Sequence, residues 1–148
     1  MSSSAHESFG FHGGFKARAA LALFALFFVS CGSTQKGSVG DTLAVGSLEL
    51  TVTSVQRYSD GFLISISAKN AGDDDYDLSK YAFEAVGGDG LVHDAGSTFF
   101  GPELFSSVTL IRGASFYGQL YFPDVFSIKE LRYEPAFSFN KALIRLED

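Results

Sequence analysis

Apolar and polar residues alternate with a period of two through most of the chain beyond residue 40. The longest alternating stretches are residues 48–53, 62–69 and 115–122. A half-buried β-strand requires this spacing, because successive side chains point to opposite faces of a sheet. Shorter stretches of the same kind occur at residues 42–45, 81–86, 108–111, 128–134 and 142–146. The pattern therefore predicts about eight strands.

Segments rich in Gly, Asn and Asp separate the predicted strands. They are residues 59–61, 70–73, 87–90 and 112–113. These residue types tolerate the backbone angles that tight turns demand, and no long helical periodicity lies between the turns. Many short strands with turns roughly every 8–12 residues are typical of a sandwich. The sequence thus predicts an all-β fold, an immunoglobulin-like antiparallel β-sandwich over residues 41–148.

Short motifs along this predicted sandwich resemble a bacterial domain family of unknown function. They are K-N-A-G-D at residues 69–73, D-L-S at 77–79, D-G-L-V-H-D at 89–94 and a late strand at 113–122. The family has an immunoglobulin-like (telokin-like) sandwich, occurs in secreted lipoproteins and is similar to the mycobacterial immunoprotective extracellular protein family. The resemblance implies the same fold, and it brings no catalytic residues.

The N-terminal segment breaks the alternating pattern. Residues 19–30 form a mostly apolar run without a charge, and Lys16 and Arg18 precede it. A bilayer-spanning helix needs about 20 apolar residues, so this run is too short. A basic region, a short apolar run and small residues at its end are instead typical of a secretory signal. We therefore expect residues 1–30 to be a cleaved signal peptide rather than a core helix.

Cys31 ends this signal and is the only cysteine of the chain, so no intramolecular disulfide can form. Residues 28–32, F-V-S-C-G, resemble the lipobox of bacterial lipoproteins. In that class the cysteine thiol receives a diacylglycerol and the new amino group is acylated, with palmitate as the expected chain. Two or more acyl chains anchor a protein stably. The resemblance implies a lipid anchor on Cys31 and a location at the cell membrane or outer membrane, facing away from the cytoplasm.

The segment after Cys31 reads G-S-T-Q-K-G-S-V-G, which is rich in Gly and Ser. Such a composition is typical of flexible coil, with a reach of roughly 15–18 Å for nine residues. We expect residues 31–40 to combine the lipidated cysteine with a tether. That tether would hold the domain near the membrane without fixing its orientation.

Charge and length narrow the classes of partner. The chain has 148 residues and a net charge of -6, which allows one domain plus a targeting segment. A nucleic-acid partner would demand a basic surface, so none is expected. An acidic domain is also repelled by anionic lipid headgroups. Membrane attachment must therefore come from the lipid anchor.

The acidic segment D-D-D-Y-D at residues 73–77 is the best candidate for site chemistry. Asp73, Asp75 and Asp77 have the D-x-D-x-D spacing of a calcium loop, and Glu84 falls at its twelfth position. Leu78, however, occupies the sixth position, where an EF-hand requires Gly, and both flanks are predicted strands. Two interpretations stay open: a calcium site of another geometry, or a solvated turn. No other cofactor is expected.

His93 is the only histidine beyond residue 30, and Asp94, Ser97 and Thr98 follow closely. A Ser-His-Asp hydrolase uses these residue types, with the carboxylate orienting the imidazole. Adjacent strand residues point to opposite faces, so Asp94 is poorly placed to orient His93. The sequence also has no G-x-S-x-G motif. An envelope hydrolase around His93 is therefore the weakest functional hypothesis, and we expect no enzyme.

Aromatic residues supply a candidate binding patch, formed by Phe99, Phe100, Phe105, Tyr117 and Tyr121. The two adjacent phenylalanines cannot both face one side of a strand, and the two tyrosines share one face of theirs. Exposed aromatic clusters often mark interaction sites, so both a binding patch and ordinary core packing stay open. The sequence as a whole predicts a lipid-anchored, non-enzymatic binding module. Its partner is an unidentified envelope protein or ligand, and a calcium-dependent module is the alternative.

Overall fold

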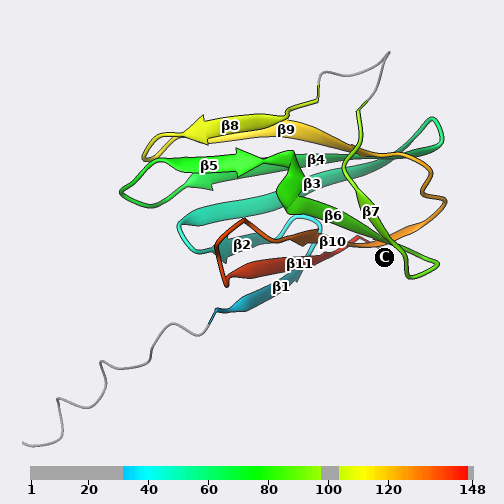
Figure 1. The fold of residues 1–148 in the computed structure, drawn as a ribbon, viewed down its shortest axis with the longest axis horizontal. Coiled ribbons are helices and arrows are strands. Elements are labelled where there is room, and N and C mark those ends of the chain that lie inside the picture. The colour runs from blue at the N-terminus through cyan, green and yellow to red at the C-terminus, as the bar shows by residue number, and fades with distance from the viewer. Residues whose placement is uncertain (1–31, 98–103, 147–148) are drawn as a thin grey trace, which may run out of the picture.

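The computed structural model describes residues 32–97 and 104–146, and β-strands dominate these residues (Figure 1). One short 3-10 helix, η1, interrupts them. In chain order the elements are β1 Thr34–Ser38, β2 Thr42–Val45, β3 Leu48–Tyr58, β4 Gly61–Asn70, β5 Tyr76–Ser79, η1 Lys80–Ala82, β6 Phe83–Gly87, β7 Val92–Asp94, β8 Ser107–Leu110, β9 Ser115–Phe122, β10 Ile128–Tyr133 and β11 Lys141–Arg145.

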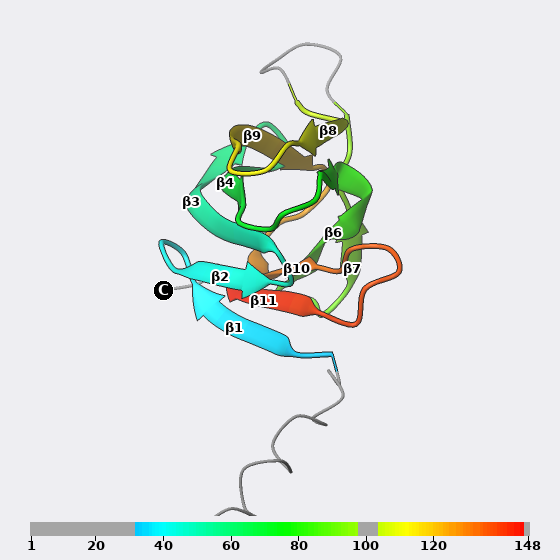
Figure 2. The ribbon, with the colours of Figure 1, turned by 90° about the vertical axis from the view of Figure 1, so that its left-hand side faces the viewer.

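The strands form two main layers and a short ladder. One sheet has the order β1-β11-β10-β6-β7, and the other has the order β2-β3-β4-β9. Strands β5 and β8 pair with each other, and β8 lies beside β9 in both views (Figures 1 and 2). All pairings are antiparallel except that of β1 with β11. The predicted immunoglobulin-like β-sandwich is therefore confirmed.

The core lies between the two sheets and follows the alternating pattern of the sequence. In β3, Leu48, Leu50 and Val52 are fully buried, and the residues between them are not. They face buried residues of the other sheet, such as Leu131 and Ile144, within one contiguous cluster. Burial of apolar surface is the main driving force of such a fold. The alternation therefore identified the inward face of the longest strands correctly.

Residues 34–38 correct the prediction of a flexible tether, because they form strand β1. Thr34 pairs with Lys141 and Ser38 with Arg145, in parallel register. Backbone hydrogen bonds to the edge of a sheet need no apolar side chains, and the side chains of β1 are exposed or only half-buried. A polar, Gly-containing composition therefore concealed a strand. Cys31 and the predicted signal peptide, residues 1–30, lie outside the described residues.

Two further differences concern short elements. Strands β5 and β7, of four and three residues, were not among the strands predicted from the alternation. The strand expected from residue 81 begins at Phe83, because residues 80–82 form η1, where the backbone N–H of Tyr81 donates to Ser79 Oγ at 3.3 Å. Across residues 32–97 and 104–146, no helix has the length and apolar character needed to span a bilayer.

Candidate functional site

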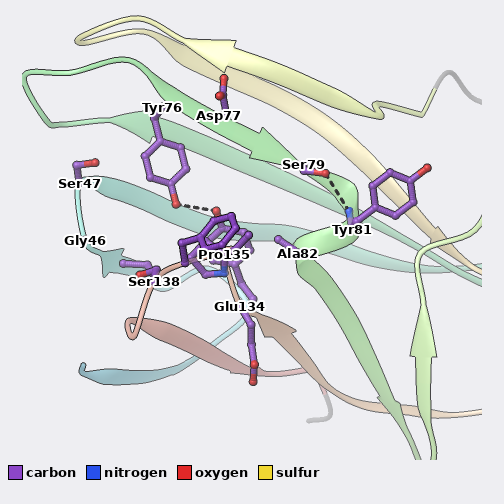
Figure 3. Close-up of a pocket in the computed structure, with 14 residues that line it drawn as sticks. Gly46, Ser47, Tyr76, Asp77, Ser79, Tyr81, Ala82, Glu134, Pro135 and Ser138 are labelled. Atoms are coloured by element: carbon purple, nitrogen blue, oxygen red, sulfur yellow. Dashed lines mark hydrogen bonds between the residues drawn. The ribbon is translucent and has the colours of Figure 1, made fainter. Parts of the chain in front are cut away.

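A groove of about 710 Å³ lies between β5 and the loop that joins β10 to β11 (Figure 3). The turn between β2 and β3 and the helix η1 complete its walls. The residues that line it are Val45, Gly46, Ser47, Tyr76, Asp77, Ser79, Tyr81, Ala82, Tyr133, Glu134, Pro135, Ala136, Phe137 and Ser138. Three separate segments of the chain, residues 45–47, 76–82 and 133–138, therefore build one cavity, and it has the size of a small-ligand site.

Two tyrosine hydroxyl groups meet within the groove. Tyr76 Oη and Tyr133 Oη lie 2.8 Å apart and share one hydrogen bond. Burial strongly raises the pKa of Tyr133 and also raises the pKa of Tyr76. A tyrosine hydroxyl with its ordinary pKa near 10 is already protonated at neutral pH, and these shifts keep both hydroxyls so in more alkaline solution. Since one hydroxyl donates to the other, the second keeps its own proton for a ligand.

Exposed aromatic side chains flank these hydroxyls. Tyr81 is 77% exposed, and Phe137 is fully exposed. Phe137 also has a positive φ of 61°, a left-handed conformation that is unfavourable for a bulky residue. The loop that holds it is braced by a bond from Ser138 N to the carbonyl of Pro135 at 3.2 Å. Strained residues of this kind concentrate at binding sites.

The polar groups of the groove are acidic or neutral. Asp77 accepts a hydrogen bond from Thr109 Oγ1 at 2.7 Å, and Glu134 pairs with Lys141 at 2.7 Å. None of the fourteen lining residues is Lys, Arg or His. Ser79 Oγ accepts a hydrogen bond from the backbone N–H of Tyr81 and so caps η1. The arrangement is suited to binding by aromatic contact and hydrogen bonding, and it lacks a nucleophile–base pair.

The acidic segment 73–77 does not form a cluster. Asp73 pairs with Arg112 at 3.0 Å, with both side chains largely exposed, whereas Asp77 belongs to the groove. Within residues 32–97 and 104–146, no three His, Cys, Asp or Glu side chains stand close enough to hold a metal ion. Calcium binding by Asp73, Asp75 and Asp77 stays a prediction that this geometry does not support.

Buried Asn70 gives the acidic segment its shape. Its Nδ2 donates to the carbonyl of Asp74 at 2.7 Å and to that of Leu110 at 2.8 Å. Its Oδ1 accepts from Gly72 N at 3.0 Å. The side chain is fully buried, so these three bonds replace the water that it loses. The segment is therefore an organised connection between β4 and β5.

The hydrolase hypothesis receives no support from the position of His93. This residue lies in β7 opposite Ala85, and its Nε2 is buried without a hydrogen-bond partner among the described residues. Ser97 Oγ instead accepts from Lys80 Nζ at 3.2 Å. Asp94 lies on the other face of the short strand, and Thr98 is outside the described residues. The structure does not assemble a Ser-His-Asp arrangement here.

The predicted aromatic patch is not one surface. Phe105 is half-buried against Phe83 and Phe116, with ring centroids 6.3 and 5.1 Å away, so it belongs to the core margin. Tyr117 is exposed as expected. Phe99 and Phe100 lie outside the described residues.

Tyr121 also departs from the expected patch, because it is buried. Its ring packs edge-on against Tyr58 at 5.9 Å, and its hydroxyl donates to the carboxylate of Asp60. That hydrogen bond is the main reason why the pKa of Tyr121 rises to about 12. Tyr117 and Tyr121 share a face of β9. Tyr58, the last residue of β3, covers Tyr121 on that face, whereas Tyr117 stays exposed.

The residues of the groove were missed by sequence reasoning. Tyr76 and Tyr81 come from one segment and Tyr133 and Phe137 from a second, distant segment, and the two share no motif. The one local signal was the sequence E-P-A-F-S-F-N at residues 134–140, where two phenylalanines stand in a segment otherwise typical of a turn.

Known proteins match this chain in structure and not in sequence. No protein-family model matches it, and no curated protein matches it in sequence. The crystal structure of YjhA from Bacillus subtilis has a TM-score of 0.62 at 20% identity, over 76% of this chain and 99% of YjhA. MPT63, a secreted protein of Mycobacterium tuberculosis, has a TM-score of 0.62 at 15% identity, over 76% and 98% of the two chains.

YcdA of Bacillus subtilis, described as a candidate lipoprotein, has a TM-score of 0.60 at 17% identity, over 72% of this chain and 38% of YcdA. Identities of this size show a shared fold and nothing finer. None of the three names describes an enzyme. At the level of the fold, the resemblance proposed from the sequence is confirmed: this chain shares the β-sandwich fold of MPT63, YjhA and YcdA.

Proposed function

We propose that this protein is a lipid-anchored, non-enzymatic binding module on the outer side of a bacterial membrane. The observation that carries the proposal is the groove, where exposed Tyr81 and the paired hydroxyls of Tyr76 and Tyr133 line one cavity. Large aromatic side chains supply much of the energy of recognition, and a few placed polar groups supply orientation. A partner is expected to bind there.

The chemistry of the groove narrows the class of ligand. Its ionisable lining residues other than tyrosine are Asp77 and Glu134, and the whole chain has a net charge of -6. An anionic ligand would meet Asp77 and find no Lys or Arg among the lining residues to pair with, since Lys141 outside the lining is already held by Glu134. A neutral or cationic ligand with an apolar face matches the lining. A segment of an envelope protein is one such ligand.

The anchor rests on the sequence F-V-S-C-G at residues 28–32. Two fold relatives, a secreted protein and a candidate lipoprotein, support a location outside the cytoplasm. We expect the full chain, expressed in a bacterium, to fractionate with membranes and to incorporate labelled palmitate. A Cys31→Ala variant should lose the label and leave the membrane fraction. Retention of that variant in the membrane at its normal mature size would contradict the anchor.

Binding in the groove is tested by photo-cross-linking in cells. A photoreactive amino acid at Tyr81 should form an adduct of discrete mass, whereas the same amino acid at exposed Leu91 should not. Leu91 follows the tip between β6 and β7, at the opposite end from the β10–β11 loop (Figure 1). An Ala136→Trp substitution, which fills the groove from its exposed wall, should remove the adduct. Equal adducts at both positions, unaffected by Ala136→Trp, would refute a groove ligand.

A further inference from the structure

Two exposed phenylalanines lie in a loop beside Gly32, the first described residue. Phe139 is 82% exposed and Phe137 fully exposed, both in the loop between β10 and β11. Gly32 packs directly on this loop, since a Cβ at Gly32 would lie 2.1 Å from the carbonyl oxygen of Phe139. Figure 2 shows the start of β1 and the start of β11 side by side. The residue that follows Cys31 is thus in contact with Phe139.

The chain directly after Cys31 is short and is held in place by hydrogen bonds. Ser33 N donates to Asn140 Oδ1 at 3.1 Å, and Lys141 N donates to the carbonyl of Ser33 at 3.0 Å. Strand β1 then continues this pairing along β11. Gly32 alone separates Cys31 from the first of these bonds, and successive Cα atoms are about 3.8 Å apart. Lipid chains on Cys31 would therefore hold Phe139 close to the bilayer surface.

We propose that Phe137 and Phe139 insert into the interfacial region of the same bilayer that holds the lipid on Cys31. The inference rests on the proposed lipid anchor. Each inserted phenyl ring removes apolar surface from water, which is favourable. The anchor makes the contact intramolecular, so two side chains suffice where they would bind a free bilayer poorly. The sandwich then has a fixed orientation, with the β10–β11 loop against the membrane.

Charge indicates which lipids this contact prefers. The loop between β4 and β5, which carries Asp73, Asp74 and Asp75, lies at the same end of the sandwich (Figure 1). Lys141, which begins β11 directly after this loop, is already paired with Glu134. Attraction to anionic headgroups therefore cannot drive the contact. Insertion is expected to be apolar, insensitive to salt and stronger in zwitterionic than in anionic bilayers.

The absence of tryptophan from the chain allows a direct test. The full lipidated chain with the substitution Phe139→Trp is purified in detergent and reconstituted into phosphatidylcholine vesicles with brominated acyl chains. Its emission should shift to shorter wavelength and lose most of its intensity to the bromine atoms. Phe137→Trp provides a second, independent probe in the same loop. Both positions are exposed, so the larger ring meets no packed neighbour.

Phe126→Trp is the matched control. Phe126 is 86% exposed but lies between β9 and β10, at the opposite end of the sandwich (Figure 1). The emission of Phe126→Trp should stay at the wavelength typical of a tryptophan exposed to water, and the bromine atoms should not quench it. Quenching at 137 and 139 without quenching at 126 would support the proposal. Similar, unquenched emission from all three variants, in protein that floats with the vesicles, would overturn it and leave the anchor intact. If neither the wild-type chain nor Cys31→Ala floats with vesicles, the anchor fails, and the inference fails with it.

Discussion

The hydroxyl oxygens of Tyr76 and Tyr133 lie 2.8 Å apart and share a hydrogen bond between two different sheets. Tyr76 is in the β5–β8 ladder, and Tyr133 ends β10 of the five-stranded sheet. The bond therefore joins the short ladder to the main layer at the point where the groove opens. The same two groups stabilise the fold and offer hydrogen bonding to a ligand.

A double-mutant cycle should reveal this coupling. Tyr76→Phe leaves the hydroxyl of fully buried Tyr133 without its partner, and we expect a loss of about 1–3 kcal/mol in the free energy of unfolding. Tyr133→Phe should cost about the same or less, since Tyr76 is only half-buried. The double variant should cost no more than Tyr76→Phe alone, because no orphaned hydroxyl is left. Urea denaturation of the four proteins measures the cycle, and strictly additive losses would contradict it.

The pair of Tyr121 and Asp60 predicts a loss of stability in alkali. The hydrogen bond between them is the main cause both of the lowered pKa of Asp60 and of the raised pKa of Tyr121, about 12. An unfolded tyrosine has a pKa near 10, so the unfolded chain loses this proton first. The stability that Tyr121 contributes is complete below pH 10 and is lost as the pH rises towards 12.

Asp60→Asn tests this pH dependence. The substitution removes the charged acceptor, so the pKa of Tyr121 should fall towards 10 and the unfolding free energy should decline less steeply between pH 10 and 12. Ultraviolet titration of tyrosinate, with Tyr121→Phe to identify this residue among the six tyrosines, follows the pKa. An unchanged titration in Asp60→Asn would show that the hydrogen bond does not control Tyr121.

Asn70 is predicted to be the most sensitive polar residue near the acidic segment. Asn70→Ala removes bonds to the carbonyls of Asp74 and Leu110 and to the N–H of Gly72. We expect the free energy of unfolding to fall by about 2–4 kcal/mol, since buried backbone groups lose their partners. Asp74→Ala keeps the backbone carbonyl and should change stability by less than about 0.5 kcal/mol. Thermal or urea unfolding that gave the two variants equal stability would show that Asn70 does not shape the segment.

Calcium is predicted to leave the thermal midpoint unchanged. Asp73 already pairs with Arg112, and Asp77 accepts from Thr109, so the carboxylates are not gathered for one ion. A true site at one hundred times its dissociation constant would add about 2.7 kcal/mol. Melts of the full chain in calcium and in chelator measure the difference. A calcium-dependent rise that Asp75→Ala abolished would restore the calcium-dependent alternative.

Phe137 is predicted to contribute to binding and to lower the free energy of unfolding. Its φ of 61° is unfavourable for phenylalanine and natural for glycine, and its side chain buries no surface in the described residues. Phe137→Gly should therefore raise the free energy of unfolding by about 0.5–1 kcal/mol. In the lipidated chain the same variant should weaken the contact of the β10–β11 loop with the bilayer, so that brominated acyl chains quench the emission of Phe139→Trp less. Ala136→Gly, a change at an exposed neighbour, is the control that should not stabilise the protein. A destabilised Phe137→Gly would show that the ring packs on something in the folded protein.

The sequence determined the strands whose side chains alternate between core and solvent. A period of two leaves an isolated strand only one way to face a core. The alternating apolar residues that are buried in this way in β3 and β4 are Leu48, Leu50, Val52, Ile64, Ile66 and Ala68. The sequence also predicted turns correctly: Ser59 and Gly113 have positive φ angles in two of the predicted turns. The resemblance to a known family of sandwich domains rested on short motifs, such as K-N-A-G-D at residues 69–73 and D-G-L-V-H-D at residues 89–94.

Only the tertiary structure decided which aromatic residues are exposed and which share a groove. Tyr117 and Tyr121 have the same pattern, yet one is exposed and the other is covered by Tyr58. Strand β1 pairs with β11 across more than one hundred residues through backbone bonds that leave no side-chain signature. The groove likewise joins Tyr76, Tyr81, Tyr133 and Phe137 from distant segments. Local patterns fix the face of a strand, whereas strand pairing and loop position arise from contacts between parts of the chain that share no local pattern.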